Sequence, residues 1–253
     1  MSHGPLLLAI ETATAAAAGV ALLRGDAVLT SRALATDRPA SELLLPAILA
    51  LLEDAHLAIA EIEAFAVSVG PGSFTGLRVG VATVKGLAFG GEALVVPVPT
   101  LAALALRAAP APGPIAALLD ARRGEVYAAI YHGDPGLHPR VGPAVLRPEA
   151  LAEALATFAA KLPCTVIGEG IAVVADALRA RFGDALRLVP PPAGLPDAVA
   201  VGRLGARLLA AGAGITAAAL TPVYLRRAEA EVQRTGERFE ASRTRFDTPG
   251  NLS

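Results

Sequence analysis

A dense run of proline and glycine interrupts the middle of the chain, where Pro110, Pro112, Gly113 and Pro114 follow one another almost directly. Proline lacks a backbone N–H and fixes its own φ, so neither a helix nor the interior of a sheet continues through such a run. The sequence therefore predicts a boundary between two lobes, residues 1–109 and residues 110–227. Residues 228–253 are rich in charge and poor in apolar anchors, which predicts a disordered tail.

The first lobe alternates short apolar runs with turn-forming residues, a pattern typical of strands. Three such runs predict an antiparallel meander at residues 6–10, 19–23 and 27–35. Helical spacing of leucine and isoleucine then predicts a helix over residues 41–55, with Ser41 as its N-cap and Pro46 in its first turn. The remaining predicted elements are strands at residues 65–69 and 94–98 and helices at residues 77–89 and 101–107.

The second lobe opens as the first one does, with an apolar strand that ends in an acid. Glu11 ends the first strand of the first lobe, and Asp120 ends the corresponding strand of the second. The later elements, all assigned to the second lobe, are strands at residues 115–119, 125–131 and 165–167, helices at residues 148–160, 171–182 and 198–211, and an extended piece at residues 221–225. The order predicts an α/β fold.

Composition excludes several classes of protein. The chain is 54% hydrophobic and has a formal net charge of -1, so it is not mainly disordered and has no general field that attracts phosphates. The longest charge-free run, residues 208–225, is alanine-rich and ends near Pro222, and it predicts no membrane span. The N-terminus lacks the basic region of a signal peptide. The single cysteine, Cys164, fits a core position in a reducing compartment, which predicts a cytoplasmic protein.

The densest motif is a glycine-rich loop between a predicted strand and a predicted helix. It contains Gly70, Gly72 and Gly76 together with Ser73 and Thr75. Such a loop at a helix N-terminus favours an anion cradle, because unpaired N–H groups and the helix dipole attract negative charge. The loop lacks the lysine of a Walker A motif and misses the dinucleotide fingerprint by one position. A tight turn that needs positive φ explains the same glycines, and both interpretations remain open.

Acids and hydroxyls at the strand ends complete a candidate nucleotide site. Two interpretations remain open here as well: these residues bind a ligand, or they cap turns at the ends of strands. The four histidines lie too far apart in sequence to predict a metal site, and neither Ser68 nor Ser73 lies in a Gly-x-Ser-x-Gly elbow. The candidate nucleotide- or anion-binding residues are Glu11, Thr12, Gly70, Gly72, Ser73, Thr75, Gly76 and Asp120.

Four segments carry a resemblance to a known family. They read LAIETAT at residues 8–14, SVGPGSFTGLRVG at 68–80, DARRGEVY at 120–127 and PVYLR at 222–226. Together they resemble the TsaB (YeaZ) family, and the resemblance spans residues 5–227. It implies an actin/Hsp70-like (ASKHA) fold of two ribonuclease-H-like lobes, which agrees with the element order above.

The resemblance also implies a function. Members of the family are non-catalytic partner subunits in bacterial synthesis of threonylcarbamoyladenosine in tRNA, beside the catalytic subunit TsaD and the ATPase TsaE. A metal-binding histidine pair of TsaD-like relatives corresponds here to Thr100 and Leu104, which implies an inactive paralogue with no catalytic residue. Glu11 replaces a frequent Asp, and Ala40 a frequent His. We therefore expect no cofactor beyond ATP or ADP at the partner interface, and tRNA contact only through the complex.

A docking face follows as a hypothesis. The helices predicted at residues 41–55 and 77–89 are expected to pair with the same two helices of TsaD, or of a second copy when the chain is alone. The expected contact residues are Leu44, Leu45, Ile48, Leu52, Leu77, Arg78, Gly80, Val81, Val84, Lys85 and Ala88. The main alternative is an ASKHA-type small-molecule kinase or ATPase that uses Glu11, Asp120 and the glycine-rich loop. A metalloprotease is the weakest alternative, because the sequence shows no metal ligands.

Overall fold

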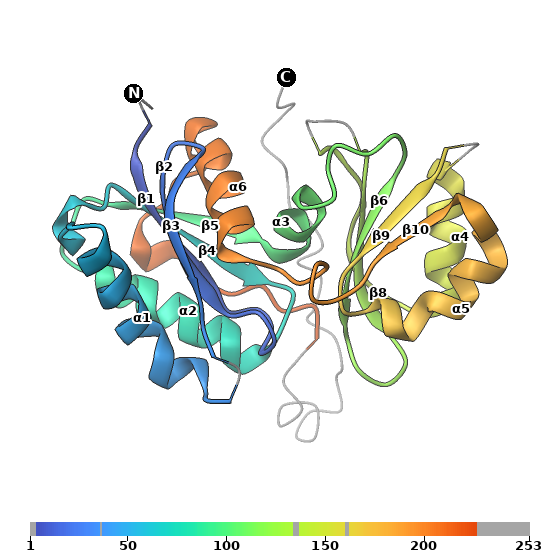
Figure 1. The fold of residues 1–253 in the computed structure, drawn as a ribbon, viewed down its shortest axis with the longest axis horizontal. Coiled ribbons are helices and arrows are strands. Elements are labelled where there is room, and N and C mark those ends of the chain that lie inside the picture. Colours follow the sequence, from blue (N-terminus) through green and yellow to red (C-terminus); the bar gives the residue numbers. More distant parts are fainter. Residues whose placement is uncertain (1–3, 36, 134–136, 160–161, 227–253) are drawn as a thin grey trace. The chain divides into compact units, whose positions relative to one another are not determined.

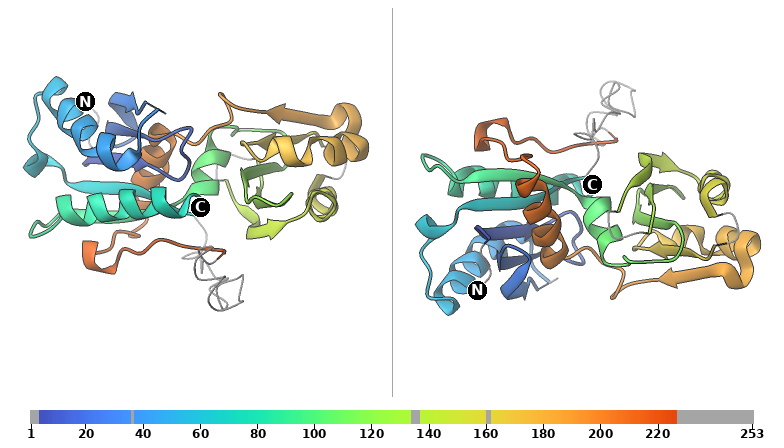
Figure 2. Two further views of the ribbon diagram at one scale, coloured as in Figure 1. Left: turned by 90° about the horizontal axis from the view of Figure 1, so that it is seen from below. Right: turned by 90° about the horizontal axis from the view of Figure 1, so that it is seen from above.

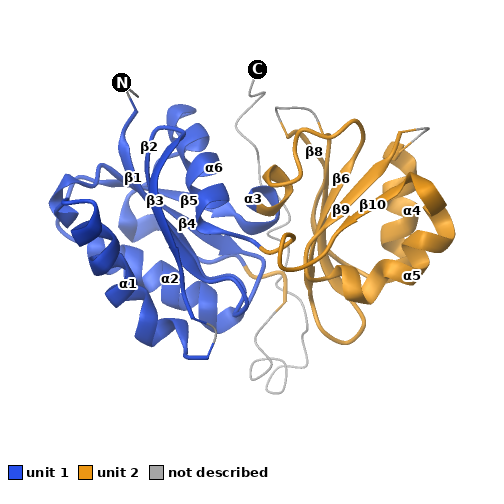
Figure 3. Cartoon of the chain, in the orientation of Figure 1, with its two compact units in different colours: residues 1–103, 196–223 blue, residues 104–195, 224–253 orange. Residues whose placement is uncertain are grey.

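Two compact units make up the chain (Figure 3). The computed structural model describes residues 4–35, 37–133, 137–159 and 162–226. Unit 1 consists of Met1–Ala103 and Pro196–Val223, and unit 2 consists of Leu104–Leu195 and Tyr224–Ser253. Within the described residues, no helix has the length and apolar character needed to cross a membrane.

Unit 1 is built on a five-stranded sheet with the order β3-β2-β1-β4-β5. The meander predicted at the start of the chain is confirmed, because β1, β2 and β3 pair antiparallel in sequence order, whereas β4 and β5 add parallel to β1. The strands are β1 (Leu6–Glu11), β2 (Gly19–Arg24), β3 (Ala27–Ala33), β4 (Ala64–Gly70) and β5 (Leu94–Pro99).

Helices cover both faces of this sheet (Figures 1 and 2). Successive side chains of a strand point to opposite faces, so Leu8 and Ile10 pack with α1 and α2, whereas Leu7 and Ala9 pack with α6. The helical segments with residues in unit 1 are α1 (Ala40–Asp54), η1 (Ile59–Glu61), α2 (Phe74–Leu87), α3 (Thr100–Leu106), α6 (Ala198–Ala210) and η3 (Ala217–Ala219).

Unit 2 repeats the strand order of unit 1, with its sheet running β10-β9-β6-β7-β8. Here too, three strands pair antiparallel in sequence order and two further strands add in parallel. Helices α4 and α5 pack on one face. The elements are β6 (Ile115–Asp120), β7 (Val126–Tyr131), β8 (Pro139–Leu146), α4 (Pro148–Ala159), β9 (Cys164–Ile167), α5 (Ile171–Phe182), η2 (Gly183–Ala185) and β10 (Leu186–Val189).

The division between the units differs from the predicted lobes 1–109 and 110–227. Helix α6, predicted in the second lobe, belongs to unit 1, and the first boundary falls between Ala103 and Leu104 rather than at the proline run. The physical reason is close packing, since Gly202 lies against Leu23 and Gly205 against Ala66, with no room for a larger side chain. The tail predicted at residues 228–253 lies outside the described residues.

Helix α1 begins differently from the prediction. Its N-cap position is Pro39, which makes no side-chain cap bond, so Ser41 lies inside the helix instead of capping it. Pro46 also lies inside the helix, beyond the first turn. Proline removes a backbone donor there, yet the position is on the exposed side of the helix, where water can bond the carbonyl that loses its partner.

Candidate functional site

The glycine-rich loop connects the end of β4 to the start of α2, and its backbone is bonded to neighbouring segments. The Ser73 N–H donates to the Ala13 carbonyl oxygen at 2.7 Å, and the Gly70 N–H donates to Thr100 Oγ1 at 3.1 Å. Ser73 is the N-cap of α2, because its Oγ accepts from the Gly76 N–H at 3.3 Å. These loop donors are therefore already engaged within the chain.

The glycines of the loop are required by close approach of other backbone segments. A Cβ at Gly76 would collide with the Thr12 carbonyl, and a Cβ at Gly72 would collide with Ala13. Gly70 has a φ of +127° and lies against the Val223 carbonyl. Of the two interpretations left open above, the structure supports the packed turn, because it accounts for all three glycines.

Glu11 and Thr12 do not form the open nucleotide site that their position suggested. Both are buried, with exposed fractions of 0% and 1%. The Glu11 carboxylate accepts the Ala13 N–H, and Thr12 Oγ1 lies against Gly80 of α2. Burial raises the pKa of Glu11 to about 7, against hydrogen bonds from the Ala13 backbone, the Ser68 side chain and the Thr12 backbone that lower it. In this arrangement neither side chain is exposed to solvent.

Asp120, another residue of the predicted nucleotide site, is the last residue of β6 in unit 2. Its Oδ1 accepts the Arg122 N–H at 2.7 Å, and its Oδ2 lies 3.4 Å from the Arg122 guanidinium. Burial, followed by the charge of Asp120, raises the pKa of the nearby Glu169. Asp120 thus stabilises the turn after its strand, the role named above as the alternative to ligand binding.

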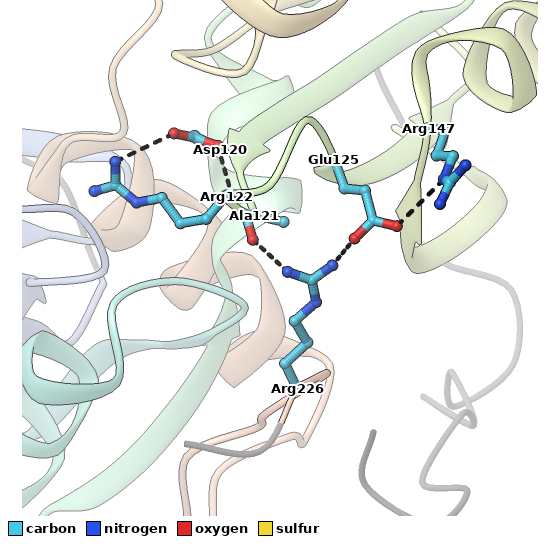
Figure 4. A network of polar contacts seen from close by, with 6 residues as sticks. All are labelled: Asp120, Ala121, Arg122, Glu125, Arg147 and Arg226. Carbon is cyan, nitrogen blue, oxygen red and sulfur yellow. Dashed lines mark hydrogen bonds and ion pairs between the residues drawn. The ribbon is translucent and has the colours of Figure 1, made fainter. Parts of the chain in front are cut away.

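A half-buried arginine joins two of the segments that carried the family resemblance (Figure 4). The Arg226 guanidinium donates to the Ala121 carbonyl oxygen and pairs with Glu125, which also lies 3.7 Å from Arg147. Sequence reasoning did not assign Arg226 a role, although it ends the PVYLR segment. Its contacts fasten the last described residues to the β6–β7 hairpin of unit 2.

We expect Arg226→Ala to destabilise unit 2 by about 2 kcal/mol, because it removes a charged hydrogen bond and leaves a poorly hydrated Glu125. The side chains of Arg226 and Glu125 are only 17% and 23% exposed. Arg122→Ala is the matched control, since the Arg122 side chain is 86% exposed and its pairing should contribute little. Calorimetric unfolding of both variants measures the difference, and equal losses would contradict the assigned role of Arg226.

The predicted docking face is mostly interior. Eight of its eleven residues are buried in the core of unit 1, so in the free chain their side chains already have partners within the chain. The cause is that an apolar helical stripe has the same spacing whether it faces its own sheet or a partner. The buried residues are Leu44, Ile48, Leu52, Leu77, Gly80, Val81, Val84 and Ala88.

Three predicted residues do lie at the surface of α1 and α2. Leu45 is 46% exposed, Arg78 is exposed with its guanidinium 3.9 Å from the centre of the Phe74 ring, and Lys85 is half-buried and donates to the Ala218 carbonyl at 3.1 Å. The sequence prediction missed Leu49, which is 56% exposed one helical turn after Leu45. That spacing was the available signal, since residues four apart lie on one side of a helix.

The described residues offer no metal centre. Among them, no group of three or more His, Cys, Asp or Glu side chains is arranged to hold a metal ion. At the positions that correspond to the histidine pair of TsaD-like relatives, Thr100 and Leu104 are both buried, and Thr100 Oγ1 accepts the Gly70 N–H.

The topology and the site define the class of protein. Two units that share one strand order, each with three antiparallel strands followed by two parallel ones, define the two-lobed actin-like (ASKHA) class of α/β proteins. The sequence model of a family described as "TsaD: tRNA N6-adenosine threonylcarbamoyltransferase" matches residues 34–234.

Individual relatives narrow the assignment to one family. The chain is 31% identical over 229 residues to the tRNA threonylcarbamoyladenosine biosynthesis protein TsaB of Escherichia coli, covering 87% of this chain and 94% of that protein. A match to the TsaB of Bacillus subtilis is 36% identical over 137 residues and covers 54% of this chain and 59% of that protein. YeaZ from Pseudomonas aeruginosa has a TM-score of 0.74 at 33% identity, over 87% of this chain and 100% of that one. The chain belongs to the TsaB (YeaZ) family.

Proposed function

We propose that this chain is a non-catalytic subunit in the synthesis of threonylcarbamoyladenosine in tRNA, and that it binds and activates a TsaD-type catalytic subunit. Its membership of the TsaB family supports the pathway. The observation that carries the docking role is the exposure of Leu45 and Leu49 on α1, a helix whose other apolar face is already buried. Exposed apolar side chains that follow one helix face are typical of interaction sites.

The remaining parts of the proposal concern assembly. We infer a complex with TsaD and the ATPase TsaE in the cytoplasm, contact with tRNA only through that complex, and a homodimer through the same helices when the chain is alone. The chain brings no cofactor of its own, and ATP or ADP binds at the interface with the partner. The formal net charge of -1 supports indirect contact with tRNA, since direct binding relies on an excess of cations.

The kinase alternative has no support in the geometry. It requires Glu11, Asp120 and the glycine-rich loop to line an open phosphate site. Instead, Glu11 is buried, Asp120 accepts the Arg122 N–H in its own turn, and the loop packs on the backbone of residues 12 and 13.

Replacing both exposed leucines of α1 by aspartate tests the docking role. We expect Leu45→Asp/Leu49→Asp to weaken binding to the TsaD-type subunit at least about 100-fold, because charges would be buried at the interface. Isothermal titration calorimetry measures the affinity, and a tRNA modification assay measures activation of the catalytic subunit. Thermal unfolding should be nearly unchanged, since both side chains are exposed.

Two further variants separate docking from folding. Leu162→Asp places the same charge at a leucine of unit 2 that is 45% exposed, and it should leave partner binding intact. Val81→Asp should reduce the stability of the free chain, since Val81 is 6% exposed. Undiminished binding by the double leucine variant would rule out this face of α1 as the docking surface.

A further inference from the structure

Glu11 is a carboxyl group placed where water does not reach it. Within the part of the chain that the structure describes, it is the only acidic residue that is fully buried. Alternation along β1 puts its side chain on the same face as Leu7 and Ala9, which pack with α6. Within the described ranges, the Oε2 atom has no hydrogen-bond partner, whereas Oε1 accepts the Ala13 N–H. A buried oxygen without a partner costs free energy, and the cost is far greater for an ionised carboxylate.

A chain of hydrogen bonds leads from this carboxyl group to the start of α2. The Glu11 carboxylate accepts the Ala13 N–H, and the Ala13 carbonyl accepts the Ser73 N–H at 2.7 Å. Ser73 in turn caps the helix through the Gly76 N–H. The peptide unit and carbonyl of Ala13 therefore stand between the buried acid and the first turn of α2. That turn carries Phe74, on whose ring Arg78 stacks.

Close packing ties the two segments of this junction together. Gly72 lies against Ala13 and Gly76 lies against the Thr12 carbonyl, so the β1–β2 turn and the loop at residues 71–76 are in direct backbone contact. In this packed arrangement the Glu11 side chain is fully buried.

Among the described residues, no neighbouring charge contributes to the shifted pKa of Glu11. Opposite it, β2 contributes Gly19, and β4 contributes the Ser68 hydroxyl. The loop at residues 71–76 contains no titratable side chain. At the start of α6, Asp197 accepts the Ala200 N–H, while Arg203 and Arg207 of that helix are exposed. None of these three charged groups contributes to the shifted pKa of Glu11.

We propose that Glu11 is a proton-operated lock on the junction between the β1–β2 turn and the glycine-rich loop: the junction stays closed when the carboxyl group is protonated, and ionisation opens it and releases the first turn of α2. The lock belongs to the free chain and does not depend on the docking role proposed above.

The size of the effect follows from linkage. The pKa of Glu11 is about 7 in the closed state, against an ordinary value of 4.5 that it regains when hydrated. Protons then favour the closed state, and the opening equilibrium should rise about tenfold between pH 6 and pH 8. The rise begins near pH 4.5, where the hydrated carboxyl group starts to ionise, and it levels off above pH 8 because Glu11 is then ionised in both states.

Hydrogen exchange of the full chain tests the lock. The amides of Ala13, Ser73 and Gly76 are followed at pH 6 and pH 8, with rates corrected for the intrinsic effect of pH. We expect their protection in the unaltered chain to fall about tenfold over this range. In Glu11→Gln, which keeps the shape but cannot ionise, the protection of the same amides should be independent of pH.

An internal reference and a second comparison complete the test. The amides of β7 in unit 2 should show no such dependence in either protein, which separates local opening from general loss of stability. Corrected protection at Ala13, Ser73 and Gly76 that is the same at both pH values in the unaltered chain would overturn the proposal, whatever the behaviour of the variant. An equal fall in the unaltered chain and in Glu11→Gln would also overturn it, because another group would then be the sensor.

Discussion

Gly76→Ala is expected to destabilise unit 1 by about 3 kcal/mol or more, although it adds a single methyl group to a helix. The Cβ would collide with the Thr12 carbonyl, which is backbone and cannot move aside without breaking the contact between the β1–β2 turn and α2. The loss should appear as a lower urea midpoint in circular dichroism, with the largest changes in hydrogen exchange at residues 11–14 and 71–76.

Gly86→Ala is the matched control in the same helix. Apart from its two chain neighbours and the backbone of its own helix, no atom lies within 4 Å of a Cβ placed at Gly86, and the position is exposed. Alanine should therefore stabilise the helix here by about 1 kcal/mol, the usual difference in helix propensity. If Gly76→Ala and Gly86→Ala changed the free energy of unfolding in the same direction, close packing would not explain the glycines of the loop.

Glu11→Gln is expected to change how the stability of the chain depends on pH. The folded-state pKa of about 7 lies above the ordinary 4.5, so the folded chain binds more protons than the unfolded chain between these values. The stabilising contribution is thus fully present below pH 4.5 and is lost as the pH rises through 7. Integrated from pH 5 to pH 9, the loss is about 2.5 kcal/mol.

The variant isolates this contribution, because every other titrating group is common to both proteins. The free energy of unfolding, measured in urea at several pH values, should fall more steeply with pH for the unaltered chain than for Glu11→Gln, and the difference should level off above pH 8. Parallel curves would show that Glu11 is hydrated in the folded chain. If the unaltered chain instead lost stability relative to Glu11→Gln as the pH fell, the pKa of Glu11 would be lowered in the folded chain.

Local sequence patterns predicted most of the elements. The apolar runs identified β1 to β7 and β9, and helical spacing identified α1 to α6, in each case with small shifts at the ends. The prediction missed β8 and β10. Strand β8 contains Pro139, Arg140, Gly142 and Pro143 and is an edge strand of its sheet. Proline is tolerated at an edge, where it removes no hydrogen bond from the interior of the sheet. Strand β10 is only four residues long and also lies at an edge.

Long-range packing was harder to predict than local structure. The spacing of apolar residues in α6 does not show which sheet the helix covers. Gly202 and Gly205 are needed because the helix packs closely on Leu23 and Ala66, and this contact is seen only in the folded structure. The same applies to the candidate site. The sequence places Glu11 at a strand end but does not show that the loop at residues 71–76 closes over that turn, and it does not separate the buried Leu44 from the exposed Leu45.

Unit 1 consists of two segments that lie far apart in the sequence, so its second segment is synthesised long after its first. Helix α6 covers the sheet face that carries Leu7, Ala9 and Leu23, yet it is synthesised after all the strands of both sheets. A nascent chain shorter than residue 198 leaves this apolar face open to water, while the sheet and helices of unit 2 have all been made. The sheet and helices of unit 2 can therefore assemble before unit 1 is complete, although residues 224–226 of unit 2 are made later still; this reverses part of the usual N-terminal-first order of folding during translation.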